Sequence, residues 1–168
     1  MNNNLRNIVD KILQENLYMT ISVASKDGDP WIANLYYVYD KNYNFYWYSP
    51  KNSLHSQRIK ENPTVALAIF DSTAVGDDVD AVYIKAKAYE ITNKSELVKG
   101  MVLYAGKMIK TKFANKASVE RFIKQYKDFQ GLSKLRMYKA VPEKFWKPAP
   151  TEMFNDKFVD SRIEVKMK

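Results

Sequence analysis

Hydrophobic positions first recur at helical spacing and then alternate. Five apolar residues near the N-terminus recur every three or four positions: Leu5, Ile8, Val9, Ile12 and Leu13. This spacing predicts a short amphipathic helix that ends near Glu15. The alternating pattern that follows predicts strands over residues 18–24, 31–39 and 44–49, separated by polar turns. Three antiparallel strands before any long helix exclude a Rossmann-type start.

The rest of the chain adds strands and longer helices. Ser53 is expected to cap a helix over residues 53–62, which Pro63 ends before a buried strand at 64–70. Further strands are expected at 81–92, 134–141 and 161–167, and further helices at 94–110 and 118–126. Pro142 should end the strand before it. These elements predict a single domain over residues 1–168, β-rich and of the α+β class.

Composition narrows the class of protein. Hydrophobic residues make up 46% of the 168 positions and aromatic residues 14%, which indicates a folded chain. No apolar run reaches the roughly 20 residues of a membrane span, and the first residues lack the features of a signal peptide. The chain has no Cys, so disulfides, thiolate metal sites and a cysteine nucleophile are excluded. We therefore expect a cytoplasmic protein without a membrane partner.

The net charge of +8 suggests an anionic partner. The basic residues are spread along the chain, and the densest block has the spacing of a solvated helix face: Lys107, Lys110, Lys112 and Lys116. This spread argues against nucleic acid as the partner. A small ligand that carries a phosphate explains the excess more locally.

Side chains that could perform catalysis by themselves are scarce. The only histidine, His55, cannot form a histidine-rich metal site, and no orienting acid can be assigned to it for a Ser-His-Asp triad. A chain poor in acid–base groups and rich in aromatic residues suits a protein whose chemistry belongs to a bound cofactor.

Residues 47–57 carry the clearest candidate binding site. A strand ends there, a loop presents Ser49, Lys51 and Ser53, and a helix begins. Free backbone N–H groups at a helix start, together with hydroxyls and an ammonium group, can hold a phosphate. A capped helix with ordinary loop polarity would give the same sequence, so both interpretations stay open at this point.

An ordered set of segments resembles the pyridoxamine 5'-phosphate oxidase-like family. The set comprises Asp27-Gly28-Asp29-Pro30, the strand through Tyr39, Asp40, residues 44–53 and Ile59-Lys60-Glu61-Asn62-Pro63-Thr64-Val65-Ala66-Leu67. The resemblance resumes at residues 85–88 and 142–146.

The resemblance implies a six- to seven-stranded antiparallel split β-barrel with a few flanking helices, which forms a homodimer and binds FMN between subunits. The second strand would run beside the isoalloxazine ring at Ala33, Asn34, Leu35 and Tyr36. The phosphate would be held by Tyr48, Ser49, Ser53, Leu54 and His55. Since the family often has an Arg-Lys pair where this chain has Leu54-His55, Lys51 is expected to supply the missing charge. Trp146 and Lys157 would approach the flavin from the partner subunit.

The resemblance does not extend to the substrate elements of pyridoxamine phosphate oxidases. Residues 151–156 contain no Arg-x-His element, and Val38 stands where a substrate-binding Lys is expected. We therefore expect an FMN-dependent oxidoreductase that acts on another small-molecule substrate or electron donor. Two alternatives stay open: a protein that binds or senses flavin, haem or a deazaflavin without turnover, and a nucleic-acid-binding barrel.

Overall fold

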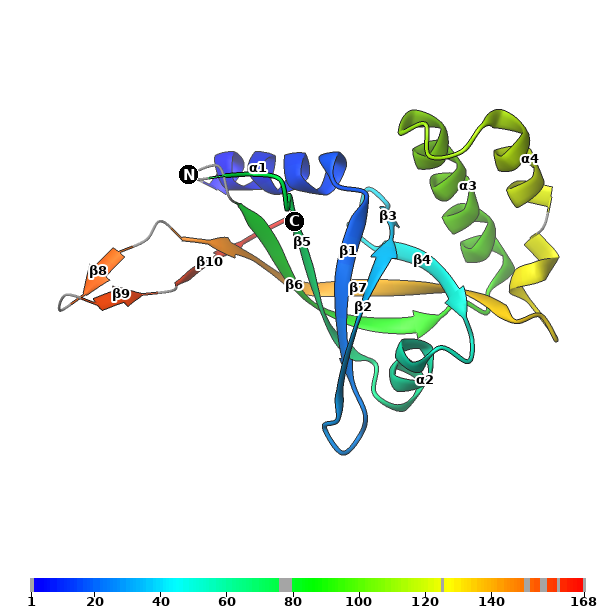
Figure 1. Ribbon diagram of the computed structural model, residues 1–168, viewed down its shortest axis with the longest axis horizontal. Helices are drawn as coiled ribbons and strands as arrows, with labels where there is room; N and C mark the ends of the chain where they lie inside the picture. The colour runs from blue at the N-terminus through cyan, green and yellow to red at the C-terminus, as the bar shows by residue number, and fades with distance from the viewer. Residues whose placement is uncertain are drawn as a thin grey trace.

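The computed structural model describes residues 2–75, 80–124, 126–149, 152–154, 157–159 and 161–167. Within these residues, seven strands form an antiparallel sheet in the order β2-β1-β5-β6-β7-β4-β3, and β10 also pairs with β7. The sheet curls into a half-barrel (Figure 1). The strands are β1 (Tyr18–Ala24), β2 (Pro30–Tyr36), β3 (Val38–Tyr39), β4 (Phe45–Pro50), β5 (Thr64–Phe70), β6 (Ala81–Glu90), β7 (Leu135–Pro148) and β10 (Arg162–Val165). The expected β-rich α+β split barrel is confirmed.

In the described part of the chain, four α-helices flank the sheet, and a separate hairpin pairs β8 (Glu152–Phe154) with β9 (Lys157–Val159). α1 crosses one end of the barrel, α2 lies near the opposite end, and α3 and α4 stand together beside it (Figure 1). The helices are α1 (Asn2–Glu15), α2 (Leu54–Glu61), α3 (Lys94–Lys110) and α4 (Lys116–Lys124), and a 3₁₀ turn follows at Tyr126–Phe129. The helix expected at 118–126 thus begins and ends two residues earlier.

The long strand expected at residues 31–39 is broken at Tyr37. β2 pairs with β1, whereas β3 pairs with β4 at the other edge of the sheet. The Tyr37 side chain is fully buried, and its hydroxyl donates to the Leu13 carbonyl of α1 at 2.8 Å. This contact lies where the chain crosses from one edge of the sheet to the other, which alternation alone does not reveal.

Pro142 does not end its strand, contrary to expectation. β7 pairs with β4 up to Ala140 and with β10 only from Phe145, so Pro142 lies between these two partners. A missing N–H group is tolerated in such a gap. On its other side β7 pairs with β6, whose register shifts between Lys85 and Ala86.

Two hydrophobic clusters lie on the two sides of the sheet. The first fills the barrel and includes Leu13 of α1, Trp47, Leu67 and Ile84. The second lies between the sheet and α3, and Tyr46 and Met137 of the sheet contact it together with several residues of α3: Leu97, Met101, Tyr104 and Met108. α3 is therefore an integral part of the fold.

Lys107 of α3 belongs to this packing and not to a solvated helix face, so that expectation was wrong. Its Nζ donates to the carbonyl oxygens of Asn16 at 2.9 Å and Tyr37 at 2.8 Å, and it lies 3.8 Å from the centre of the Tyr37 ring. Burial lowers the pKa of Lys107 to about 8. One turn earlier, the Tyr104 hydroxyl donates to the Tyr36 carbonyl. α3 thus holds two consecutive carbonyls where β2 ends.

Candidate functional site

The candidate phosphate-binding segment lies between the end of β4 and the start of α2. The backbone N–H of Lys51 donates to the Lys134 carbonyl at 2.8 Å, and that of Ser53 donates to the Pro50 carbonyl at 3.0 Å. These bonds fix the loop against the start of β7. Ser53 occupies the expected N-cap position, but its side chain makes no capping hydrogen bond. The first turn of α2 therefore presents backbone N–H groups without a side-chain cap.

The hydroxyls of this segment turn toward His55. Nε2 of His55 lies 2.8 Å from Oγ of Ser49 and 3.1 Å from Oγ of Ser53, which also donates to Oγ of Ser56 at 2.9 Å. Ser49, His55 and Ser56 are buried, and burial lowers the pKa of His55. The structure thus brings Ser49, Ser53 and His55 together as a polar cluster in which Ser49 and His55 are buried and Ser53 is half-buried. This arrangement explains why Ser53 does not cap the helix.

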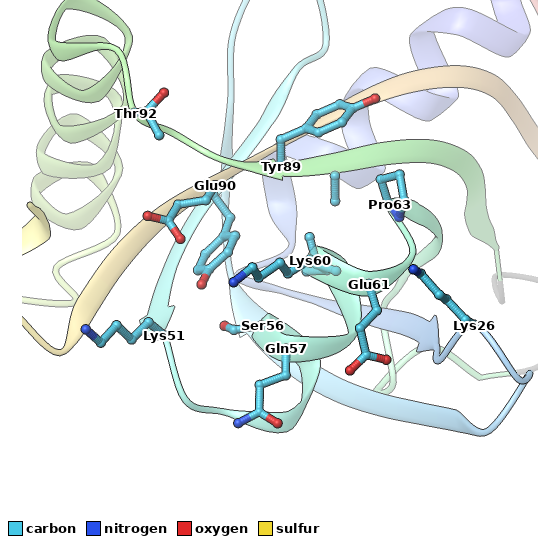
Figure 2. A pocket seen from close by; sticks show the side chains of 13 residues that line it. Lys26, Lys51, Ser56, Gln57, Lys60, Glu61, Pro63, Tyr89, Glu90 and Thr92 are labelled. Carbon is cyan, nitrogen blue, oxygen red and sulfur yellow. The ribbon is translucent and has the colours of Figure 1, made fainter.

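A cavity of about 940 Å³ lies beside α2 (Figure 2). Lys51 and Lys60 line it, together with Lys26 of the β1–β2 turn, and Ser56 and Tyr138 contribute hydroxyls. Two carboxylates also line it, but each pairs with an arginine: Glu61 with Arg58 at 3.2 Å and Glu90 with Arg136 at 2.9 Å. The side chains around the cavity therefore favour an anionic ligand.

The four predicted flavin-strand residues divide between the two faces of β2. Ala33 and Leu35 pack against the barrel core. Asn34 is exposed, and its Oδ1 accepts a hydrogen bond from the Thr20 hydroxyl at 2.7 Å. Only the outward-facing residues of β2 can therefore meet a ligand that lies on the outer surface of the sheet.

Tyr36 and Tyr48 both pack against Tyr104 of α3. Their rings lie 5.2 Å and 5.1 Å from the Tyr104 ring, so β2 and β4 contact the same helical residue. Tyr36 also packs against Phe113 at 4.5 Å, and desolvation raises its pKa. Tyr48 faces away from the buried cluster around His55, because successive residues of β4 point to opposite sides.

Trp146 lies on the same outer face of the sheet as Asn34. One row of paired residues crosses five strands: Asn34, Thr20, Ala68, Tyr83 and Trp146. At about 4.8 Å per strand, Asn34 and Trp146 of one chain are roughly 19 Å apart measured along the curved sheet. A hollow of about 190 Å³ lies in the middle of this face, lined by small side chains of β1 and β5 and by Tyr83, Trp146 and Arg162.

The structure does not describe the side chains of two predicted features, Lys157 and the segment 151–156. Lys157 begins β9, but the structure describes only its backbone, so its role stays a prediction. Residues 151, 155 and 156 lie outside the described residues. Val38, by contrast, is buried against the α3 cluster, so its side chain does not face a ligand.

Sequence reasoning missed Tyr104 and Lys107, which position the end of β2. A usable signal was present, because Tyr104 and Lys107 lie between the buried positions Met101 and Met108 of α3 and follow Met101 at intervals of three residues. Among the described residues, no group of three or more His, Asp or Glu side chains could hold a metal ion. No helix in the described part of the chain has the length and apolarity needed to cross a membrane.

Comparison with known proteins identifies related folds. The sequence profile of the family described as pyridoxamine 5'-phosphate oxidase matches residues 6–146. HutZ, a haem storage protein from Vibrio cholerae, is 14% identical with a TM-score of 0.59, and the match covers 82% of this chain and 89% of HutZ. A haem-binding protein from Mycobacterium smegmatis is 14% identical with a TM-score of 0.61, over 81% of this chain and 50% of that one. ChuZ from Campylobacter jejuni is 12% identical with a TM-score of 0.68, and the match covers 98% of this chain and 60% of ChuZ. No curated protein sequence matches significantly.

Proposed function

Because the chain belongs to the pyridoxamine 5'-phosphate oxidase family, we propose that it binds FMN at a homodimer interface and acts as a flavin-dependent oxidoreductase. The observation that supports this most is the row of residues across the outer face of the sheet. Asn34 and Trp146 lie at two ends of a row whose centre carries small side chains. A two-fold axis above that centre, parallel to the sheet and perpendicular to the row, would bring Trp146 of the partner subunit toward Asn34.

The residues present fit a flavin phosphate at the start of α2. The uncapped first turn offers backbone N–H donors, and Lys51 is exposed beside it. A phosphate there would accept hydrogen bonds from the backbone N–H groups that the Ser53 side chain leaves without a cap. The buried Ser49 hydroxyl would hold the loop through its contact with His55. The Ser53 hydroxyl is only half-buried, so it would turn from His55 and Ser56 to donate to the phosphate.

The outer face would receive the ring system. The Asn34 amide can donate to a ring carbonyl through its nitrogen, since only its oxygen is engaged by Thr20. The small side chains of Ala66 and Ala68 allow a flat group to approach the sheet closely. Bound FMN would supply hydride or electron transfer, while the protein orients it and excludes water.

Oxidation of pyridoxamine 5'-phosphate is not part of this proposal. Val38 is buried, and residues 151–156 lack the Arg-x-His element expected for the substrate phosphate. Without these groups, much of the binding energy for the transition state would be missing. Formation of pyridoxal phosphate at about one turnover per second or faster would contradict this part of the account.

The second candidate is binding or sensing of haem or flavin without turnover. Two of the similar solved structures are those of a haem storage protein and a haem-binding protein. His55 is the only imidazole, but it is buried and its Nε2 contacts two hydroxyls, which argues against axial ligation of haem.

The absorption spectrum of the purified protein tests these candidates. Flavin bands, with FMN released on denaturation, are expected. A Soret band without flavin would favour haem, and failure of the colourless protein to bind added FMN would contradict the proposal. Steady-state oxidation of NAD(P)H by the flavin-loaded protein would then separate an oxidoreductase from a sensor.

A further inference from the structure

The net charge of the protein is concentrated in one projecting unit. Residues 94–134 contain ten Lys or Arg and three Asp or Glu, so they carry +7 of the net charge of +8. They form α3, α4 and the 3₁₀ turn, which stand together beside the barrel (Figure 1). Between Glu96 and Glu120 the chain contains no acidic residue. Basic residues occur throughout the chain, but acidic residues offset them outside this segment, so the excess of positive charge lies in the α3–α4 unit.

The same unit exposes large apolar side chains. Six of them are exposed: Val98, Val102, Ile109, Phe113, Ile123 and Leu132. At 100° per residue, Val98, Val102 and Ile109 fall within about 40° on one side of α3. Lys99 and Lys110 follow on one side of this stripe, about 60° and 80° beyond Val102. Val102 and Ile109 are 59% and 58% exposed, so the core of the protein does not use this face.

The turn between α3 and α4 combines both properties. Ile109, Lys112 and Lys116 line a hollow of about 580 Å³ there. Lys110 and Phe113 are exposed within the same turn. Apolar side chains ringed by ammonium groups can enter the boundary of a lipid layer while the charges contact its headgroups.

We propose that the α3–α4 unit docks on an anionic phospholipid surface. Nine of its ten basic residues are lysines, and exposed Val, Ile and Leu side chains would gain nothing against a nucleic-acid backbone. A second copy is disfavoured as the occupant because two units of +7 would repel each other. The expectation of no membrane partner rested on the absence of a spanning segment, which does not bear on attachment to a surface. The proposal is independent of the FMN site.

Sedimentation with phospholipid vesicles tests the proposal. The protein should bind phosphatidylcholine vesicles that contain about one-third phosphatidylserine, and bind pure phosphatidylcholine vesicles much less. Replacing Lys110, Lys112 and Lys116 together by Gln should weaken binding about a hundredfold, or about fivefold for each lysine. The matched control replaces Lys11, Lys41 and Lys166 by Gln, which are exposed elsewhere and give the same change in net charge. It should weaken binding less than about threefold.

Insertion can be read at a single position because the chain has no cysteine. A polarity-sensitive dye on Ile109→Cys should brighten with anionic vesicles, whereas the same dye on Lys41→Cys should not. Equal losses in the two triple variants would overturn the proposal, since net charge alone would then explain binding. Absence of vesicle binding would also overturn it, as would tighter binding to a single-stranded oligonucleotide that the Lys110, Lys112 and Lys116 substitutions abolish.

Discussion

Nε2 of His55 lies 2.8 Å from Oγ of Ser49, and this contact joins the first turn of α2 to the end of β4. Both residues are buried, and among the described residues the contacts of His55 Nε2 are hydroxyl groups, not carboxylates. The imidazole therefore gains from being neutral, because charging it would place a cation in a site without a counterion. The contact links the fold to the candidate phosphate segment, which runs between these two residues.

Stability should decline at mildly acidic pH because of His55. Burial lowers the pKa of His55 in the folded state, so the unfolded chain binds a proton at higher pH than the folded one. The stabilisation is complete above the unfolded pKa of about 6.5 and is lost as pH falls toward the folded value. Urea unfolding at a series of pH values measures this. His55→Gln should flatten the profile, and an equally steep profile in that variant would assign the effect elsewhere.

Two glycines of α3 should respond oppositely to alanine. A Cβ at Gly100 would lie 2.5 Å from Sδ of Met137 and 3.2 Å from the Tyr46 ring, and both neighbours are buried. Gly100→Ala should therefore lower the free energy of unfolding by about 1–3 kcal/mol through overpacking. Gly106 has open space at that position, so Gly106→Ala should raise it by about 0.5–1 kcal/mol. Thermal unfolding of both variants measures these changes. A higher free energy of unfolding in Gly100→Ala would contradict the close packing of Gly100 against Met137 and Tyr46.

Loss of the Lys107 ammonium should destabilise the end of β2. Lys107→Met keeps the apolar stem but leaves the carbonyls of Asn16 and Tyr37 without their donor. We expect a loss of about 1–3 kcal/mol in the free energy of unfolding. Lys110→Met, at an exposed position of the same helix, is the control and should change it by less than about 0.5 kcal/mol. Similar losses of stability in the two variants would contradict a specific role for the hydrogen bonds from Lys107 to the Asn16 and Tyr37 carbonyls.

The regular parts of the fold were predictable, whereas several contacts between distant segments were not. Alternation located most strands because one face of each is buried, as Val65, Leu67 and Ile69 show in β5. The break at Tyr37 depends on α1, and the burial of Lys107 depends on carbonyls more than 65 residues away in sequence. Such contacts leave no periodic pattern.

The candidate site shows the same division. Composition indicated a loop and helix start rich in hydroxyls, and the structure brings Ser49, Ser53 and His55 together there. Which way those hydroxyls point could not be predicted, because the direction depends on the burial of His55 in the first turn of α2. The joint role of Asn34 and Trp146 required the register of strands that are far apart in sequence.

FMN affinity should depend on the start of α2. Charge-assisted hydrogen bonds to a phosphate contribute about 1.5–3 kcal/mol each, so Ser53→Ala combined with Lys51→Ala should weaken FMN binding at least about a hundredfold. Riboflavin, which lacks the phosphate, should bind the parent protein poorly. Fluorescence titration measures both affinities, with Lys41→Ala as a control at another exposed lysine. Unchanged affinity in the double variant would place the phosphate elsewhere and leave the segment as an ordinary helix start.

The mass of the flavin-bearing species tests the central claim most directly. Light scattering with simultaneous absorbance detection on a sizing column reports the mass and the flavin content of each species. The account predicts one species of about twice 19.6 kDa that carries one FMN per chain. Trp146→Ala should weaken its FMN binding, because Trp146 would cover the cofactor from the partner subunit. A monomer of 19.6 kDa that binds FMN stoichiometrically would contradict the shared site.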